Sequence, residues 1–281
     1  MTSEFLAEGF SKVDQVDDPD RYSECLRVAY GRPFVLQYKA RSFELLQLTH
    51  GQRVLDIGCG SGDDVAVMAQ MVMPEGSAVG VDSSTHFIQE AIQCHSGKEL
   101  PVEFHIANAE KLFFDDMSFD RCRIDRVLQY ISDSQAAIQE IARVLKPDGL
   151  ALAYDNDWQT FTINASNIEF SQAAARIWTE SFPNPRVGSH LEKLFEQAGF
   201  CEIQVIPFTS TTDSFALADS LYNLRQLSER LVKNGNYDQS TANEWLADLV
   251  KKTGTEATLT TLTAFMVVGK RPKSHSPTQA L

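Results

Sequence analysis

A run of alternate glycines follows a short apolar segment that contains an acid. Residues 54–62 read Val-Leu-Asp-Ile-Gly-Cys-Gly-Ser-Gly, which places Asp56 just before Gly58, Gly60 and Gly62. Because glycine has no Cβ, such a loop can adopt positive φ and let a ligand lie against the backbone where a strand turns into a helix. The pattern is typical of a loop that binds a nucleotide-type cofactor.

The spacing and charge of this loop discriminate between cofactors. A dinucleotide fingerprint, G-x-G-x-x-G, requires a third glycine where this chain has Asp63. A carboxylate at Asp56 would repel a pyrophosphate, but it suits a ligand that carries an ammonium and a sulfonium, which is S-adenosylmethionine. Twenty residues after Gly62, an apolar run ends in Asp82, whose carboxylate could accept hydrogen bonds from both hydroxyls of a ribose.

Several segments together resemble a known family. Residues 54–62, 79–82, 108–110, 119–120 and 143–149 are similar, in the same order, to the successive motifs of class I S-adenosylmethionine-dependent methyltransferases. The resemblance is to the small-molecule branch that includes the ubiquinone and menaquinone biosynthesis methyltransferases, and it covers roughly residues 20 to 272. Asp148 replaces a glycine of the last motif, which a turn can tolerate.

The resemblance implies roles for residues at the strand ends. Asn108 and Ala109 match the position that reads the adenine edge, and Ile124 matches one whose backbone approaches the methionine part of the cofactor. Asn108 has an alternative role, which is to cap the turn at Glu110. The expected cofactor-binding residues are Asp56, Gly58, Gly60, Gly62, Asp82, Ser83, Asn108, Ala109, Ile124 and Gln129.

Candidates for catalysis lie after the fourth strand and at the end of the fifth. Gln129 matches a position that often faces the reaction centre in the family, and its alternative role is to cap the next loop. Residues 154–158 are polar and aromatic, and Asp157 is the first candidate for a general base. His190 is a second candidate base, although it stands where a helix begins and could be a solvated cap residue.

Aromatic residues are the candidates for contacts with the acceptor substrate. Trp158 follows the fifth strand, and Tyr22 and Tyr38 lie in the expected N-terminal helices. At such positions aromatic side chains often serve packing instead, so both interpretations stay open.

Alternating strand and helix patterns predict an α/β fold. The family fold is a doubly wound, Rossmann-like sheet of seven mostly parallel strands, here with N-terminal helices and a helical lid inserted before the last strand. The expected strands lie near residues 53–57, 78–82, 102–106, 119–124, 149–155, 201–208 and 261–269, and the expected helices near 20–31, 33–48, 63–73, 84–95, 133–145, 167–181, 189–198, 214–233 and 238–252.

The insertion before the last strand distinguishes this chain from a minimal methyltransferase, which joins its last two strands by a tight hairpin. About fifty residues intervene here, and long insertions are often lids or binding elements. An oligomer interface is the alternative. We expect an N-terminal helical lid segment (1–50), a cofactor-binding core (51–160), the rest of the sheet with the lid at about 210–258 (161–272), and a disordered tail (273–281).

The composition of the chain argues against several classes of function and site. The formal charge is −13, which argues against a broad nucleic-acid footprint. The five cysteines are scattered without a C-x-x-C pair, so neither a disulfide framework nor a metal site is expected. The N-terminus does not resemble a signal peptide and no apolar run could span a bilayer, so we expect a cytoplasmic protein without membrane insertion.

These observations favour an enzyme that moves a methyl group from S-adenosylmethionine to O, N or C of a small organic acceptor and leaves S-adenosylhomocysteine. The small-molecule acceptor is the expected partner, and the protein is expected to be a monomer or a homodimer. Two alternatives stay open: a protein that binds S-adenosylmethionine for other chemistry, and a methyltransferase that acts on protein.

Overall fold

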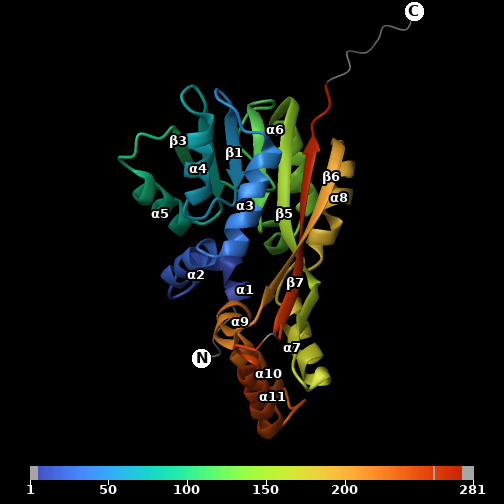
Figure 1. Cartoon of the computed structure of the whole chain (residues 1–281). Coiled ribbons are helices and arrows are strands. Elements are labelled where there is room, and N and C mark those ends of the chain that lie inside the picture. The colour runs from blue at the N-terminus through green and yellow to red at the C-terminus, as the bar shows by residue number, and fades with distance from the viewer. Residues whose placement is uncertain (1–5, 256, 274–281) are drawn as a thin grey trace, which may run out of the picture.

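The strands form one mixed sheet. The computed structural model describes residues 6–255 and 257–273 (Figure 1). Its strands are β1 (Arg53–Ile57), β2 (Ser77–Asp82), β3 (Val102–Ile106), β4 (Phe119–Asp125), β5 (Leu145–Ile163), β6 (Cys201–Thr212) and β7 (Thr260–Lys270). They lie in the order β3-β2-β1-β4-β5-β7-β6, and β7 runs antiparallel to both of its neighbours while the other pairs are parallel. The predicted seven-stranded, mostly parallel sheet is confirmed.

Four of the helices begin at a capping side chain. The helical segments are α1 (Leu6–Gly9), η1 (Phe10–Gln15), α2 (Asp20–Tyr30), α3 (Pro33–Leu46), α4 (Asp63–Val72), α5 (Thr85–His95), η2 (Leu128–Tyr130), α6 (Ser134–Val144), α7 (Ile168–Glu180), α8 (Val187–Gln197), α9 (Phe215–Tyr222), α10 (Leu224–Lys233) and α11 (Gln239–Lys252). Side chains of Ser84, Asp133, Asn167 and Asp238 each accept a hydrogen bond from a backbone N–H in the first turn of α5, α6, α7 and α11.

Strand alternation decides which side chains meet which helices. Leu55 and Ile57 of β1 pack on the face covered by α6 and α8. Val54 packs on the opposite face, which α3 and α4 cover. Because residues two apart on a strand share a face, Asp56 also projects toward α3 and α4. The same alternation on β4 directs the polar residues of that strand to the α3 face.

The last three strands are longer than predicted, and they carry the helical insertion. Their pairing continues to Ile163 on β5, Thr212 on β6 and Thr260 on β7. At that end α9, α10 and α11 stand together with α7, away from β1 to β3 (Figure 1). Buried Leu224, Leu227, Leu231, Trp178 and Trp245 belong to their shared core. The insertion is therefore helical, with its own apolar core.

One stretch that was predicted to be helical forms two separate helices in the structure. The stretch 214–233 is broken at Asn223, which has φ 51° and separates α9 from α10. Asparagine adopts this left-handed conformation more readily than most residues.

No helix within residues 6–255 and 257–273 has both the length and the apolar character needed to cross a membrane. The tail predicted to be disordered, 273–281, lies outside the described residues apart from Lys273.

Candidate functional site

A cavity of about 650 Å³ lies at the carboxyl ends of the central strands. The strand order reverses between β1 and β4, and open α/β sheets bind ligands at such a switch point. Residues of α2 and α3 line the cavity, as do residues of β5, β6, β7, α7 and α9. The volume is typical of a site that holds small organic molecules.

The glycine loop has the backbone that its sequence predicts. Gly58, Gly60 and Gly62 have φ of 71°, 52° and 81°. A Cβ on Gly58 would lie 2.1 Å from the Val127 side chain, and one on Gly62 would lie 2.6 Å from Phe104, so both positions require glycine for packing. A Cβ on Gly60 would meet only a leucine methyl, at 3.2 Å. Gly58 and Gly60 line the cavity, whereas Gly62 holds α4 against the sheet.

Asp82 presents a buried carboxylate at the end of β2. Its Oδ2 accepts a hydrogen bond from the Gly60 N–H at 3.0 Å, and its Oδ1 accepts one from the Ser84 N–H at 2.9 Å. Burial raises the pKa of Asp82, although these two donors oppose the shift. Each oxygen keeps a second lone pair, so the carboxylate can accept further bonds from a ligand. Asp82 and Ser83 both line the cavity.

Asn108 lines the cavity, but its side chain is already engaged. Its Oδ1 accepts a hydrogen bond from the Glu110 N–H at 2.9 Å, which is the capping arrangement that the sequence left open. Ala109 lines the cavity beside it. The contact with adenine stays a prediction for both residues.

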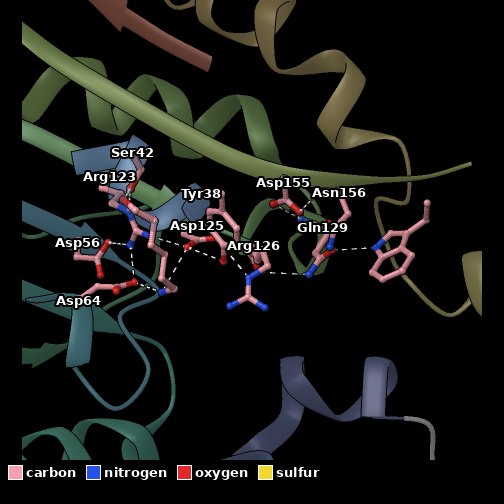
Figure 2. Close-up of polar contacts among 12 residues, drawn as sticks. Tyr38, Ser42, Asp56, Asp64, Arg123, Asp125, Arg126, Gln129, Asp155 and Asn156 are labelled. Atoms are coloured by element: carbon pink, nitrogen blue, oxygen red, sulfur yellow. Dashed lines mark hydrogen bonds and ion pairs between the residues drawn. The ribbon is translucent and has the colours of Figure 1, made fainter. Parts of the chain in front are cut away.

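A buried cluster of charges forms the floor of the cavity (Figure 2). The Arg123 side chain is 1% exposed, and its Nη1 lies 3.0 Å from Asp56 Oδ1 and 3.0 Å from Asp64 Oδ2. Its Nη2 lies 2.5 Å from Asp125 Oδ2. Lys39 Nζ pairs with Asp64 and lies 3.7 Å from Asp125. Arg126 Nε also contacts Asp125, so three carboxylates face three cations.

Two carboxylates of the cluster have pKa values shifted in opposite directions. Burial raises the pKa of Asp56 against the opposing charge of Arg123. Burial acts in the same direction on Asp64, but the charges of Arg123 and Lys39 outweigh it and lower the pKa of Asp64. Among the described residues, Asp56 has one cation at ion-pair distance, Arg123, which it shares with Asp64 and Asp125. A cationic ligand beside Asp56 would stabilise its ionised form.

Gln129 connects the loop after β4 to the wall made by β5. Its Oε1 accepts hydrogen bonds from Trp158 Nε1 at 2.8 Å and from Asn156 Nδ2 at 3.2 Å. Its backbone N–H donates to Asp155 Oδ2 at 3.2 Å. The Trp158 ring stacks on Phe182 with centroids 4.3 Å apart. Gln129 lines the cavity, and its side chain holds the aromatic wall in place.

The candidate bases Asp157 and His190 do not line the cavity. Strand alternation directs Tyr154, Asn156 and Trp158 of β5 into the cavity, so Asp157 projects to the other side. There Asp157 Oδ1 accepts a hydrogen bond from the Gln159 N–H at 3.0 Å. His190 is exposed on α8. A catalytic role stays a prediction for both residues.

Two other expected site residues also lie outside the cavity lining. Tyr22 is 3% exposed and packs edge-on against Phe10, with ring centroids 5.0 Å apart. Ile124 is buried in the core beneath α6 and α8, whereas Arg123 and Asp125 on either side of it line the cavity. Tyr38 does line the cavity: its hydroxyl donates to Asp125 Oδ2 at 3.3 Å.

Sequence reasoning missed most of the cavity floor and wall. The missed lining residues include Lys39, Asp64, Arg123, Asp125, Phe182 and Tyr222. One signal was available, because an arginine within a central strand is rarely buried unless it is paired with carboxylates. Arg126, which follows β4, also reaches the cluster, because its Nε lies 3.3 Å from Asp125 Oδ1.

Comparisons with known proteins agree with this geometry. A family model described as a methyltransferase domain matches residues 48–199, more than half of the chain. An uncharacterized 37.1 kDa protein in transposon TN4556 of Streptomyces fradiae is 34% identical over 214 residues, which are 75% of this chain and 61% of that protein. This chain thus spans less than two thirds of that relative.

This chain is also similar to a known enzyme and to a solved structure. A demethylmenaquinone methyltransferase of Geobacillus kaustophilus is 26% identical over 193 residues, which cover 62% of this chain and 81% of the enzyme. The structure of phosphoethanolamine N-methyltransferase 2 of Haemonchus contortus in complex with S-adenosyl-L-methionine superposes with a TM-score of 0.60 and 18% identity. It covers 96% of this chain and 61% of that one, and the likeness shows a shared fold.

Substitution of Arg123 tests the buried cluster. Arg123→Met leaves Asp64 with Lys39, Asp125 with Lys39 and Arg126, and Asp56 without its ion-pair partner, so the free energy of unfolding should fall by about 3–5 kcal/mol. The matched control is Arg41→Met, because Arg41 pairs with Glu44 on the surface of α3. That exposed pair is worth at most about 1 kcal/mol. Urea denaturation of both variants measures the difference, and equal losses would contradict the cluster's importance.

Asp155 should make stability depend on pH. Burial raises the pKa of Asp155 to about 8. The folded protein therefore keeps this proton over a pH range in which the unfolded chain has lost it, and stability falls as pH rises from about 4 to about 8. Relative to wild type, Asp155→Asn should gain up to about 1.4 kcal/mol per pH unit across that range. A difference in unfolding free energy that does not change with pH would refute the assignment.

Proposed function

This chain belongs to the family of class I S-adenosylmethionine-dependent methyltransferases, and we propose that it moves a methyl group from that cofactor to a small organic acceptor. The single observation that carries the proposal is the cavity, in which the glycine loop and Asp82 meet an acidic floor at the switch point of the sheet. The cofactor occupies the half of the cavity next to the carboxyl ends of β1, β2 and β3. The acceptor occupies the half that β5, β6 and β7 line.

The residues of the first half fit the cofactor. Gly58 and Gly60 have positive φ and no side chain, so a ligand can approach the backbone closely, and Asp82 keeps lone pairs for ribose hydroxyls. Asp56 shares the guanidinium of Arg123 with Asp64 and Asp125 in a buried cluster. A carboxylate that shares its cation in this way suits a ligand with an ammonium and a sulfonium. Ala109 and Asn108 close the far end of this half.

When bound, S-adenosylmethionine supplies an activated methyl group on its sulfonium. The residues of this chain then have three tasks: to hold the acceptor in line with the methyl group, to exclude water, and to keep the cavity wall rigid. Gln129 serves the third task through its hydrogen bonds to Asn156 and Trp158. The stacked rings of Tyr38 and Tyr154, with centroids 4.0 Å apart, support the same wall from α3.

A small acceptor suits the walls of the second half. The lining side chains there come from β5, β6 and β7 and from the helices α7 and α9, which lie at the end of these long strands. Many of these side chains are aromatic. The demethylmenaquinone methyltransferase that this chain resembles acts, by its name, on a small organic molecule.

We also propose that the protein works in the cytoplasm. The five cysteines are unpaired, which supports a reducing compartment such as the cytoplasm. That the reaction needs no metal, and that the protein is a monomer or a homodimer, remain predictions.

Removal of the Asp82 carboxylate tests the cofactor site. Calorimetric titration of the wild-type protein with S-adenosylmethionine and S-adenosylhomocysteine should show binding of both. Hydrogen bonds to a charged group are worth about 1.5–3 kcal/mol each. Asp82→Ala loses two of them to the ribose, so both ligands should bind at least about 100-fold more weakly.

The control is Asp115→Ala, because Asp115 is exposed on the loop before β4 and does not line the cavity. Binding of both ligands to this variant should match wild type. Retention of full affinity in Asp82→Ala would refute the cofactor site. Binding without formation of S-adenosylhomocysteine across a broad acceptor screen would instead favour the alternative in which the bound cofactor serves other chemistry.

A further inference from the structure

We propose that the acceptor is an aromatic oxyanion, a phenolate or an aromatic carboxylate, held between aromatic walls by the guanidinium groups of Arg126 and Arg32. This inference rests on the proposed function, because it names the class of molecule that enters the acceptor half of the same cavity.

Charge is divided unequally across the cavity. The lining carboxylates on the cofactor side belong to β1, to α4, to β2 and to the loop after β3, and they are Asp56, Asp63, Asp64, Asp82 and Glu110. The remaining lining carboxylate, Asp125, contacts Arg123, Lys39 and Arg126. Among the described residues, those that line the cavity from β5, β6, β7, α7 and α9 carry no charge. An amine acceptor would therefore find no free carboxylate in its half.

Arg126 is held in place at the border between the halves. It follows β4 with φ 56°, a conformation that costs a non-glycine residue about 1–2 kcal/mol. Its backbone N–H donates to the Tyr154 carbonyl at 2.7 Å, and its Nε lies 3.3 Å from Asp125 Oδ1. Figure 2 shows the guanidinium pointing away from the sheet. Within the described parts of the chain, no acceptor is within hydrogen-bond distance of its Nη1 or Nη2, and both nitrogens can serve a ligand.

Arg32 supplies a second cation from the other wall. It stands at the start of α3, lines the cavity and interacts electrostatically with Tyr222 of α9. Within residues 6–255 and 257–273, no carboxylate lies at ion-pair distance from its guanidinium. A partly buried cation without a counter-ion is costly, so an anionic ligand that enters this half gains from it.

The walls between these cations suit a planar ring. Tyr154 and Trp158 present aromatic surface from β5, and Phe182 and Tyr222 present it from the helical segments. Stacked and edge-on aromatic pairs stabilise each other, and guanidinium groups recognise planar oxyanions through parallel N–H donors. The acceptor half is thus apolar in its walls and cationic at its border.

An anionic acceptor also explains the chemistry of this half. The methyl carbon exchanges its bond to sulfur for a bond to the acceptor oxygen; the sulfur keeps the electron pair of the broken bond, and the oxyanion supplies the pair of the new one. No proton leaves, so no general base is required. This agrees with an acceptor half whose described lining residues include no Asp, Glu or His.

The test uses three two-ring probes of equal size and different charge. The protein is first titrated with S-adenosylhomocysteine. The saturated protein is then titrated with 2-naphthoate, 2-naphthamide and 2-naphthylmethylammonium. Naphthoate should bind at least about tenfold more tightly than either of the others. Arg126→Gln and Arg32→Gln should each weaken naphthoate binding about tenfold and leave the affinity for naphthamide within about twofold.

Arg41→Gln is the control, because Arg41 lies on the exposed surface of α3 outside the cavity lining. It should leave all three affinities unchanged. The proposal is overturned if naphthylmethylammonium binds as tightly as naphthoate, if none of the probes binds, or if both cavity variants weaken all three probes equally. Failure of the first titration would overturn the proposed function itself, and it is observed separately.

Discussion

The buried guanidinium of Arg123 is the constraint on which the cavity depends. A charge in a central strand must be paired, and Arg123 finds its carboxylates on β1, on α4 and on its own strand. Lys39 extends the same cluster to α3. Removing one member of such a cluster leaves uncompensated charge in the interior. The cluster therefore fixes the positions of α3 and α4 relative to the end of the sheet, which is where the two ligands must meet.

The same cluster separates two electrostatic environments. Beneath β1 to β3 the lining is acidic, and it suits a cofactor with positive charge. Beneath β5 to β7 the lining is uncharged and aromatic, with Arg126 and Arg32 at its border. The acidic lining of the first half and the two arginines at the border of the second would direct each ligand to its own half and favour their alignment. The long strands β5, β6 and β7 make this possible, because they carry the helical segments that close the acceptor half.

Local patterns predicted the strands, the glycine loop and Asp82, because each depends on residues that are close in sequence. The cluster of Arg123 could not be predicted in this way, since it joins four elements whose contacts depend on tertiary packing. Asp157 shows a different limit: its chemistry fitted a base, but strand alternation directs Tyr154, Asn156 and Trp158 into the cavity and Asp157 away from it. The break at Asn223 was hidden because asparagine also occurs within helices.

A crystal structure of the complex with S-adenosylhomocysteine tests the central claim most directly. The account predicts that the ribose hydroxyls lie within hydrogen-bond distance of Asp82 and that the amino group lies on the side of Asp56, with the wall of Trp158 and Tyr222 left for the acceptor. Density for the adenosine against that aromatic wall, or a ribose that does not contact Asp82, would contradict the division of the cavity into an acidic cofactor half and an aromatic acceptor half.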